Sequence, residues 1–272
     1  MQDGKVLKEQ FALSLLDMEV LPREVFVRQQ EIPAGHYFPP HHHNWHQLLY
    51  ALSGVLVVTV EGERYFVPPQ QAIWLPIGAE HSVYSEYGAD LKSLYIDAKF
   101  ALPGVERSCV LQVTPLVREL IREAAGFEVE YPQQGYEQDL IQLLLQALCR
   151  LERESIHLPW PTEPDLVRLC NQLYEQPDDT APTAELAQRL AISQRTLDRR
   201  FRKATGMSLK HWRLQLRMLK AVEMLNTSRS ITNIALELGY GSLSAFTFMF
   251  RERMGISPAQ YRKQLDPGLG DG

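Results

Sequence analysis

The stretch from Ser230 to Arg262, SITNIALELGYGSLSAFTFMFRERMGISPAQYR, decides the fold of the C-terminal part of this chain. Its first apolar residues recur at helical spacing, and Ser230 before them is a favoured helix N-cap residue. Gly239 follows at the point where that helix must end and the chain must turn. Ser242 can then cap a second helix. A short helix, a tight glycine turn and a second helix are the parts of a DNA-binding helix-turn-helix.

The same stretch resembles the C-terminal signature of the AraC/XylS family of bacterial transcription regulators. The resemblance implies a sequence-specific regulator that binds double-stranded DNA through two helix-turn-helix units and contacts RNA polymerase if it is an activator. The positions that carry it are Ile234-Ala235, Gly239-Tyr240, Ser244-Ala245-Phe246, Phe250, Gly255, Ser257-Pro258 and Tyr261-Arg262.

A second helix-turn-helix pattern comes earlier in the chain, within residues 183–204. Thr183 is expected to cap a short helix, and Ser193 is expected to cap the helix that reads DNA. Leu197 and Phe201 lie four residues apart, so both face the inside of this unit. The outward positions are the DNA-binding candidates of the first unit: Gln194, Arg195, Asp198, Arg199 and Arg202.

Arg195 and Arg199 are expected to contact bases, because a guanidinium donates two parallel hydrogen bonds to O6 and N7 of guanine. Asp198 could accept a hydrogen bond from cytosine or orient a neighbouring arginine. By the resemblance, a long helix capped by Ser208 holds the two units so that each enters a successive segment of the major groove. Phosphate or solvent contacts are expected for the other basic residues: Arg202, Lys203 and Arg217.

The second recognition helix carries fewer polar side chains than the first. Phe248 stands where many family members place arginine, and it can touch a thymine methyl group or turn into the core. We therefore expect this unit to contribute mostly phosphate contacts, with base discrimination resting on the first unit. Its outward candidates are Ser242, Leu243, Ser244, Thr247 and Arg251, with Gly241 beside them.

The charge of the chain is unevenly distributed. The 272 residues carry a net charge of -5. Residues 1–161 contribute -9 and residues 162–272 contribute +4. Residues 189–220 alone hold ten basic side chains and one acidic side chain, which predicts a local phosphate-facing surface on an acidic protein. The chain shows no membrane-length apolar run, no signal-peptide pattern and no metal-type pairing of its 3 cysteines, so we expect a cytoplasmic protein.

Residues 25–96 contain several short β-prone runs separated by proline and glycine turns, which indicates an antiparallel sandwich or barrel. Within them, the spacing of Gly35, His41-x-His43, Gln47 and Gly54 resembles the first cupin motif. Pro76-x-Gly78-x-x-His81 resembles the second. The fold expected is thus a multidomain chain, with an all-β cupin (jelly-roll) barrel and following helices, then an all-α double helix-turn-helix domain.

The cupin resemblance suggests a pocket in the barrel. His41, His43 and Gln47 are two or four residues apart, so on one strand they would share a face, and His81 could join them from another. The cupin carboxylate is replaced by Gln47, a poorer ligand, and Gln70 and Ser85 also depart from the motifs. Three readings stay open: a divalent metal held by His41, His43 and His81; an organic effector held by these residues and Gln47, with Trp45 and Trp74 as apolar walls; or a filled barrel. The first two make the barrel the sensor of an unknown small molecule or metal that controls DNA binding, and no catalytic residue is expected.

The residues after the barrel are expected to be helical. Tyr136–Glu154 has apolar positions on too many faces for a lone surface helix, so it either forms a homodimer contact, as the resemblance implies, or packs in the core. Prolines at positions 159, 161 and 164 indicate an extended connector, onto which Trp160 could dock. The expected organisation is a cupin-like sensor domain (1–110), a helical dimerisation region (111–156), a linker (157–164) and a DNA-binding domain (165–265).

Overall fold

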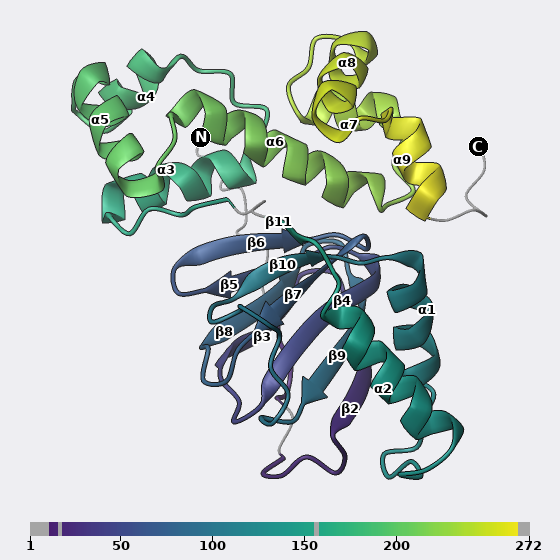
Figure 1. Cartoon of the computed structure of the whole chain (residues 1–272). Helices are drawn as coiled ribbons and strands as arrows, with labels where there is room; N and C mark the ends of the chain where they lie inside the picture. Colours follow the sequence, from purple (N-terminus) through teal and green to yellow (C-terminus); the bar gives the residue numbers. More distant parts are fainter. Residues whose placement is uncertain (1–10, 16–17, 155–157, 266–272) are drawn as a thin grey trace. The chain divides into compact units, whose positions relative to one another are not determined.

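The computed structural model describes residues 11–15, 18–154 and 158–265 (Figure 1). Backbone contacts divide the chain into an N-terminal unit of residues 1–61 and 65–156 and a C-terminal unit of residues 62–64 and 157–272. The first ten residues of the expected sensor domain, and residues 155–157 around the expected start of the linker, lie outside the described residues. Each unit is described by itself below.

The N-terminal unit consists of two facing β-sheets, as the cupin resemblance led us to expect (Figure 1). One sheet has the order β1 (Phe11–Ala12), β3 (His36–His41), β8 (His81–Ser85), β5 (Leu56–Val60) and β6 (Glu63–Val67). The other has the order β11 (Arg153–Glu154), β10 (Cys109–Gln112), β7 (Gln71–Leu75), β4 (His46–Gly54), β9 (Ala89–Ile96) and β2 (Val25–Ile32). Strands β1 and β3 pair in parallel, whereas the pairs β2–β9, β3–β8, β4–β7, β4–β9, β5–β8, β7–β10 and β10–β11 are antiparallel.

Side-chain alternation along the strands creates two separate apolar cores. On β7, Ile73 and Leu75 belong to the core between the two sheets, whereas Trp74 belongs to a core on the opposite face of its sheet. Helices α1 (Pro115–Ala124) and α2 (Tyr136–Leu148) cover that second face. The barrel interior is therefore left to the inward residues of the strands, and the helices do not reach it.

The helix expected over Tyr136–Glu154 is shorter than predicted. It ends at Leu148, and Arg153–Glu154 instead form strand β11 against edge strand β10. The chain turns back after the helix, so that Leu151 is buried and β11 supplies backbone partners to β10. Tertiary pairing has overridden the helical propensity of this segment.

Within the described residues 158–265, the regular structure of the C-terminal unit is helical apart from an isolated antiparallel β-bridge between Leu158 and Arg64. Four predicted serine caps are confirmed: Ser193, Ser208, Ser230 and Ser242 each accept a hydrogen bond from the backbone N–H three residues on. Thr183 does not cap as predicted, because Pro182 takes that position and Thr183 begins the helix. The helices are α3 (Pro164–Glu175), α4 (Thr183–Arg189), α5 (Gln194–Thr205), α6 (Leu209–Leu225), α7 (Ile231–Glu237), α8 (Leu243–Met254) and α9 (Pro258–Leu265).

The proline-rich connector is anchored on the C-terminal unit by two tryptophans. The Trp160 side chain is buried, and its ring centre lies 5.2 Å from that of Trp212 on α6. The indole nitrogen of Trp212 donates to the carbonyl oxygen of Pro159 at 2.8 Å. The described part of the connector is thus packed rather than free. Among the described residues, none of the helices has the length and apolar character needed to cross a membrane.

Candidate functional site: a histidine pocket and two DNA-reading helices

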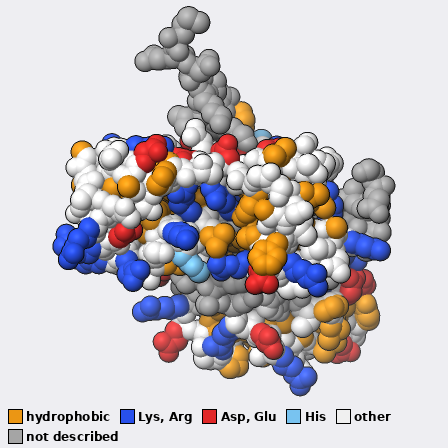
Figure 2. Space-filling model, turned by 90° about the horizontal axis from the view of Figure 1, so that it is seen from above, with side chains coloured by type: hydrophobic (Ala, Val, Ile, Leu, Met, Phe, Trp, Pro, Cys, Tyr) orange, Lys and Arg blue, Asp and Glu red, His pale blue; other side chains and the backbone are white. Residues whose placement is uncertain are grey.

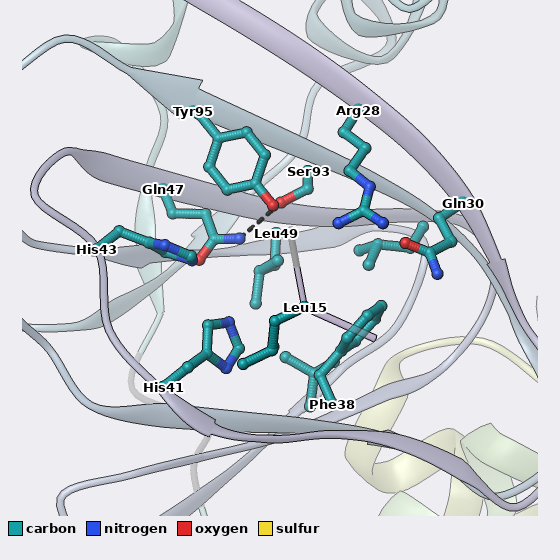
Figure 3. A pocket seen from close by; sticks show the side chains of 12 residues that line it. Leu15, Arg28, Gln30, Phe38, His41, His43, Gln47, Leu49, Ser93 and Tyr95 are labelled. Carbon is teal, nitrogen blue, oxygen red and sulfur yellow. Dashed lines mark hydrogen bonds between the residues drawn. The ribbon is translucent and has the colours of Figure 1, made fainter. Parts of the chain in front are cut away.

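A narrow, partly open hollow lies within the barrel (Figure 3). Its walls come from both sheets, so residues far apart in the sequence meet there. Figure 3 shows His43, Gln47, Ser93, Tyr95 and Arg28 along one side of the hollow, and His41, Leu15 and Phe38 along the other. The lining residues are Leu15, Arg28, Gln30, Phe38, His41, His43, Gln47, Leu49, Val83, Leu91, Ser93 and Tyr95.

The three histidines predicted from the cupin spacing converge. Each of His41, His43 and His81 offers one ring nitrogen, and these three atoms all lie within 4.8 Å of one another. His41 and His81 are direct cross-strand partners on β3 and β8. The expectation that His41, His43 and Gln47 share one strand is wrong, because His41 ends β3, His43 lies in the connection and Gln47 is on β4. The bend at Asn44 between the two strands directs them to one place.

The backbone fixes the tautomer of two of these rings. Nδ1 of His41 lies 2.7 Å from the carbonyl oxygen of Pro39, and Nδ1 of His81 lies 2.9 Å from that of Ala79. A carbonyl oxygen can only accept, so a neutral ring with this contact carries its proton on Nδ1 and leaves the Nε2 lone pair free. Metal-binding histidines typically donate their other ring N–H to a backbone carbonyl in this way. Nε2 of His81 and Nε2 of His43 are buried and have no hydrogen-bond partner among the described residues.

The imidazoles are held in the neutral form that binds a metal. Burial, followed by the neighbouring histidines His41 and His81, lowers the pKa of His43 to about 3. Burial is also the main cause that lowers the pKa of His81 to about 4, although the hydrogen bond that its ring donates to the Ala79 carbonyl oxygen acts to raise that pKa. The pKa of His41 is lowered for the same primary reason. At neutral pH the cluster therefore offers lone pairs rather than positive charge.

Gln47 is buried beside the histidines and is only partly satisfied. Its Nε2 donates to the hydroxyl oxygen of Ser93 at 2.6 Å, whereas its Oε1 is buried without a partner in the described structure. The amide thus keeps one oxygen available for a ligand. As an acceptor it is weaker than the carboxylate expected at this cupin position.

The two tryptophans expected as pocket walls do not line the hollow. Trp45 packs behind His43, with the two rings stacked at 5.5 Å between their centres. Trp74 faces the opposite side of its sheet, where it stacks on His46 at 4.9 Å. The physical reason is strand parity, because Trp74 is the cross-strand partner of Leu48, whereas the inward Gln47 opposes Leu75. Trp74 is therefore a core residue of the helix-covered face.

Several lining residues were not predicted from the sequence. Arg28 on β2 directs its guanidinium towards the hollow (Figure 3), and it has no ion pair or hydrogen bond among the described residues. Tyr95 and Ser93 on β9 stand beside Gln47. These residues belong to no motif, and their place follows from strand register: Arg28 is opposite Ser93, which is opposite Leu49.

In the first DNA-reading unit, the predicted contact residues lie on one accessible face of α5. Gln194, Arg195, Arg199 and Arg202 are exposed and Asp198 is half-buried, while Leu197 and Phe201 are fully buried. Within the described chain, the side chains of Arg195, Arg199 and Arg202 make no hydrogen bond or ion pair. Their guanidinium groups are thus available to a polyanion.

Arg217 does not belong to this face, contrary to expectation. Its guanidinium donates to the carbonyl oxygens of Pro177 at 2.7 Å and Asp179 at 2.9 Å. Arg213 donates to the carbonyl oxygens of Ala181, at 2.6 Å, and Asp179. Both arginines fasten the segment between α3 and α4, which explains part of the basic excess in residues 189–220 without any DNA contact.

The second unit presents the predicted face on α8. Ser242, Leu243, Ser244 and Arg251 are exposed, as is Gly241, and Thr247 is half-buried. Phe248 is 71% exposed, which excludes the alternative that it turns into the core. Phe246 and Phe250 fill the core instead, with their ring centres 5.8 Å apart.

Two known protein families match this chain, and together the matches cover parts of both units. Residues 25–209 match the family described as "AraC-like ligand binding domain", and residues 186–264 match that described as "Helix-turn-helix domain". The chain belongs to the AraC family of transcription regulators. It has the family's two parts, a ligand-binding N-terminal domain and a DNA-binding C-terminal domain, which confirms the resemblance that the C-terminal signature indicated.

Individual relatives agree with this assignment. The chain is 33% identical to the HTH-type transcriptional regulator NimR of Escherichia coli over 227 residues, covering 84% of this chain and 83% of NimR. It is 24% identical to the HTH-type transcriptional activator RhaS of Escherichia fergusonii, covering 89% and 93%. Among solved structures it resembles unsaturated-fatty-acid-bound ToxT of Vibrio cholerae, with 13% identity, a TM-score of 0.39 and coverage of 93% of this chain and 100% of ToxT. It also resembles the AdpA DNA-binding domain in complex with a target DNA, with 31% identity, a TM-score of 0.36 and coverage of 39% and 96%.

Proposed function

We propose that this AraC-family protein is a one-component regulator in which a divalent metal in the barrel forms part of the sensor. His41, His43 and His81 would hold the ion through Nε2 atoms, with the Gln47 amide oxygen beside them. The supporting observation is that two buried Nε2 atoms lack partners while the backbone fixes the tautomer that frees such lone pairs. Three imidazole nitrogens are suitable ligands for zinc, copper, iron and nickel, so the residues present fit a divalent ion of this group.

A bound ion would supply a Lewis-acidic position for an oxygen or nitrogen of a small-molecule effector. The chain supplies the rest of that binding site. The Arg28 guanidinium can pair with an anionic group of the effector, and the apolar side chains of Leu49 and Leu91 can hold its carbon atoms. This proposal assigns binding alone to the site, and it requires no reaction.

DNA binding is proposed to rest on the exposed face of α5. Arg195 and Arg199 would read guanine, with Gln194 and Asp198 beside them, and Arg202 would contact phosphate. The supporting observation is the lack of any protein partner for these arginines among the described residues. From α8, Ser242, Ser244 and Arg251 would add contacts to the same duplex.

We further propose that the protein works as a homodimer in the cytoplasm, where its DNA is. Exposed apolar side chains on α1 and α2 support dimerisation, because Leu116, Tyr136 and Leu143 face away from the core that Leu140 and Leu144 fill. RNA polymerase would be a partner if the protein activates transcription. Effector binding would act by favouring one of two arrangements of the regulator, which requires a different affinity for each.

The metal proposal is tested by metal content. Tag-free protein, purified without chelator, is assayed by inductively coupled plasma mass spectrometry beside His43→Ala and His42→Ala variants. His42 is the matched control, because it lies next to the cluster in sequence but is exposed and outside it. About one metal per chain in wild type and in His42→Ala, lost in His43→Ala with unchanged circular dichroism, is the expected result. Metal-free wild-type protein with native circular dichroism, after purification from metal-supplemented cells, would refute it.

The DNA proposal is tested by binding measurements at one stated salt concentration. Arg195→Ala and Arg199→Ala should each weaken binding to a selected site by about tenfold or more and relax base preference at one position. Arg168→Ala, an exposed arginine on α3, is the control and should bind normally. Unchanged site preference in both α5 variants would contradict the assignment.

A further inference from the structure

The recognition helix of the second unit exposes an apolar stripe. Phe248 is 71% exposed and Leu243, five residues or about 1.4 turns earlier, is 42% exposed, with the half-buried Thr247 between them around the helix. The helix does not need these side chains for its own packing, because Phe246 and Phe250 already fill the core. Because the core is already filled, a large aromatic side chain that stays exposed on the same helix indicates that Phe248 contacts a binding partner.

Three features of the surroundings indicate that this partner is DNA. The stripe begins in the first turn after the Ser242 cap, which is the end of a recognition helix that approaches base edges. Arg251 follows Phe248 by three residues on the same helix and is exposed, so a cation lies beside the apolar stripe, with the exposed Glu252 and Arg253 following it. On the face of the molecule drawn in Figure 2, exposed hydrophobic side chains are interspersed with Lys and Arg side chains. DNA fits this combination of apolar and cationic side chains, because it is a polyanion that carries apolar groups in its major groove.

The chemistry of the bases then selects the contact. A benzyl side chain has no donor or acceptor, so it cannot recognise the O6 and N7 edge of guanine. The C5 methyl of thymine is the one apolar group that a base pair shows in the major groove. We infer that Phe248, with Leu243 and Thr247 beside it, reads thymine methyl groups.

This inference rests on the DNA-binding function and adds a division of labour to it. The arginines of α5 read guanine by hydrogen bonds, whereas α8 reads thymine by apolar contact. The second unit therefore discriminates between bases, which replaces the expectation that it mainly contacts phosphates. The operator should consist of a guanine-bearing segment followed by a thymine-bearing segment.

The test removes single methyl groups from the DNA. In vitro selection with the full-length protein first gives a binding site, and each thymine of that site is then replaced by deoxyuridine, which lacks only the methyl group. Wild-type affinity should fall about fourfold at one or two positions in the segment read by α8, the factor expected for losing one buried methyl-sized contact. Phe248→Ala should bind the thymine site more weakly and should no longer distinguish thymine from deoxyuridine.

Controls separate this inference from the function on which it rests. Leu236→Ala removes another exposed apolar side chain, 59% exposed, from α7 of the same unit, and it should keep the thymine preference. Arg195→Ala should lose affinity through α5 but keep the deoxyuridine effect. Failure of the wild-type protein to select any site would refute the DNA-binding function itself.

Two outcomes would overturn the inference while leaving DNA binding intact. One is a selected site in which no thymine responds to deoxyuridine replacement. The other is a Phe248→Ala variant with wild-type affinity and an unchanged deoxyuridine response. If that variant binds DNA normally but fails to activate transcription with purified RNA polymerase, the occupant of the stripe is a protein.

Discussion

The ammonium nitrogen of Lys220 lies 3.0 Å from a carboxylate oxygen of Glu223, and both side chains are almost completely buried in the C-terminal unit. The same nitrogen lies 3.5 Å from the centre of the Tyr174 ring, so α3 and α6 enclose the pair together. Each charge therefore compensates the other in a place that water does not reach.

Removing one charge of this pair should destabilise the protein more than replacing both charged residues with apolar ones. Glu223→Gln leaves Lys220 buried without its counter-charge and should lower the free energy of unfolding by about 3 kcal/mol. The double variant Lys220→Met/Glu223→Met should recover most of that loss. Urea denaturation followed by tryptophan fluorescence measures both, since Trp212 lies on the same helix. A single variant as stable as wild type would show that the pair contributes nothing.

The histidine pocket predicts a pH dependence for the metal-free protein. In the folded state His43 and His81 have pKa values of about 3 and about 4, whereas unfolded histidine titrates near 6.5. Below pH 6.5 the unfolded chain therefore binds protons that the folded chain does not, so stability falls as the pH falls towards 4. Each histidine contributes at most about 1.4 kcal/mol per pH unit. Thermal unfolding with a chelator between pH 7 and 5.5 checks this, and His43→Asn should show a shallower decline.

Arginines that bind backbone carbonyls and arginines on the exposed face of α5 should differ in their effects on stability and on DNA binding. Arg217→Ala removes hydrogen bonds to two backbone carbonyls and should lower the melting temperature by several degrees. Arg199→Ala should leave the melting temperature nearly unchanged and weaken DNA binding. Differential scanning fluorimetry and fluorescence anisotropy on the same preparations give both quantities. The assignment is wrong if Arg217→Ala weakens DNA binding without any loss of stability.

Gly239 should not tolerate a side chain. Its backbone has a φ of +77°, and an added Cβ would stand 3.0 Å from backbone atoms of Asp178. Gly239→Ala should therefore cost more than 1 kcal/mol of stability, since strain and the close approach add. Gly255, with a similar φ of +73° but open space around it, is the matched control and should cost less. Equal losses at the two positions would mean that the contact with Asp178 is unimportant.

The helix boundaries of the C-terminal unit could be read from the sequence because their causes are local. Ser193 and Ser230 cap within three residues of themselves, and Gly206 and Gly255 end helices by adopting a positive φ. The fate of Arg217 could not be read in this way, because its acceptors at Pro177 and Asp179 lie about forty residues away. A basic side chain on a helix has the same pattern whether it binds a phosphate or a carbonyl.

In the barrel, the sequence predicted the three clustered histidines and missed the residues beside them. His41, His43 and His81 carry a recognisable spacing, whereas Arg28 and Tyr95 reach the hollow only through the register of β2 and β9. Register joins strands that are not consecutive, and no short pattern encodes it. Parity along β7 would have excluded Trp74, since Ile73 and Leu75 on either side of it face the inner core.

Helix α6, 17 residues long and unbroken, joins the two DNA-reading units, with a short turn at each of its ends. Such a helix is about 25 Å long, comparable to the advance of the duplex in three-quarters of a turn. One base pair inserted between the two recognised segments would rotate them by about 35° relative to each other, and the helix has no joint that absorbs this rotation. The protein should therefore be sensitive to the helical phase of its operator: half a turn of added DNA would place one segment on the far side of the duplex, and only one unit at a time could bind.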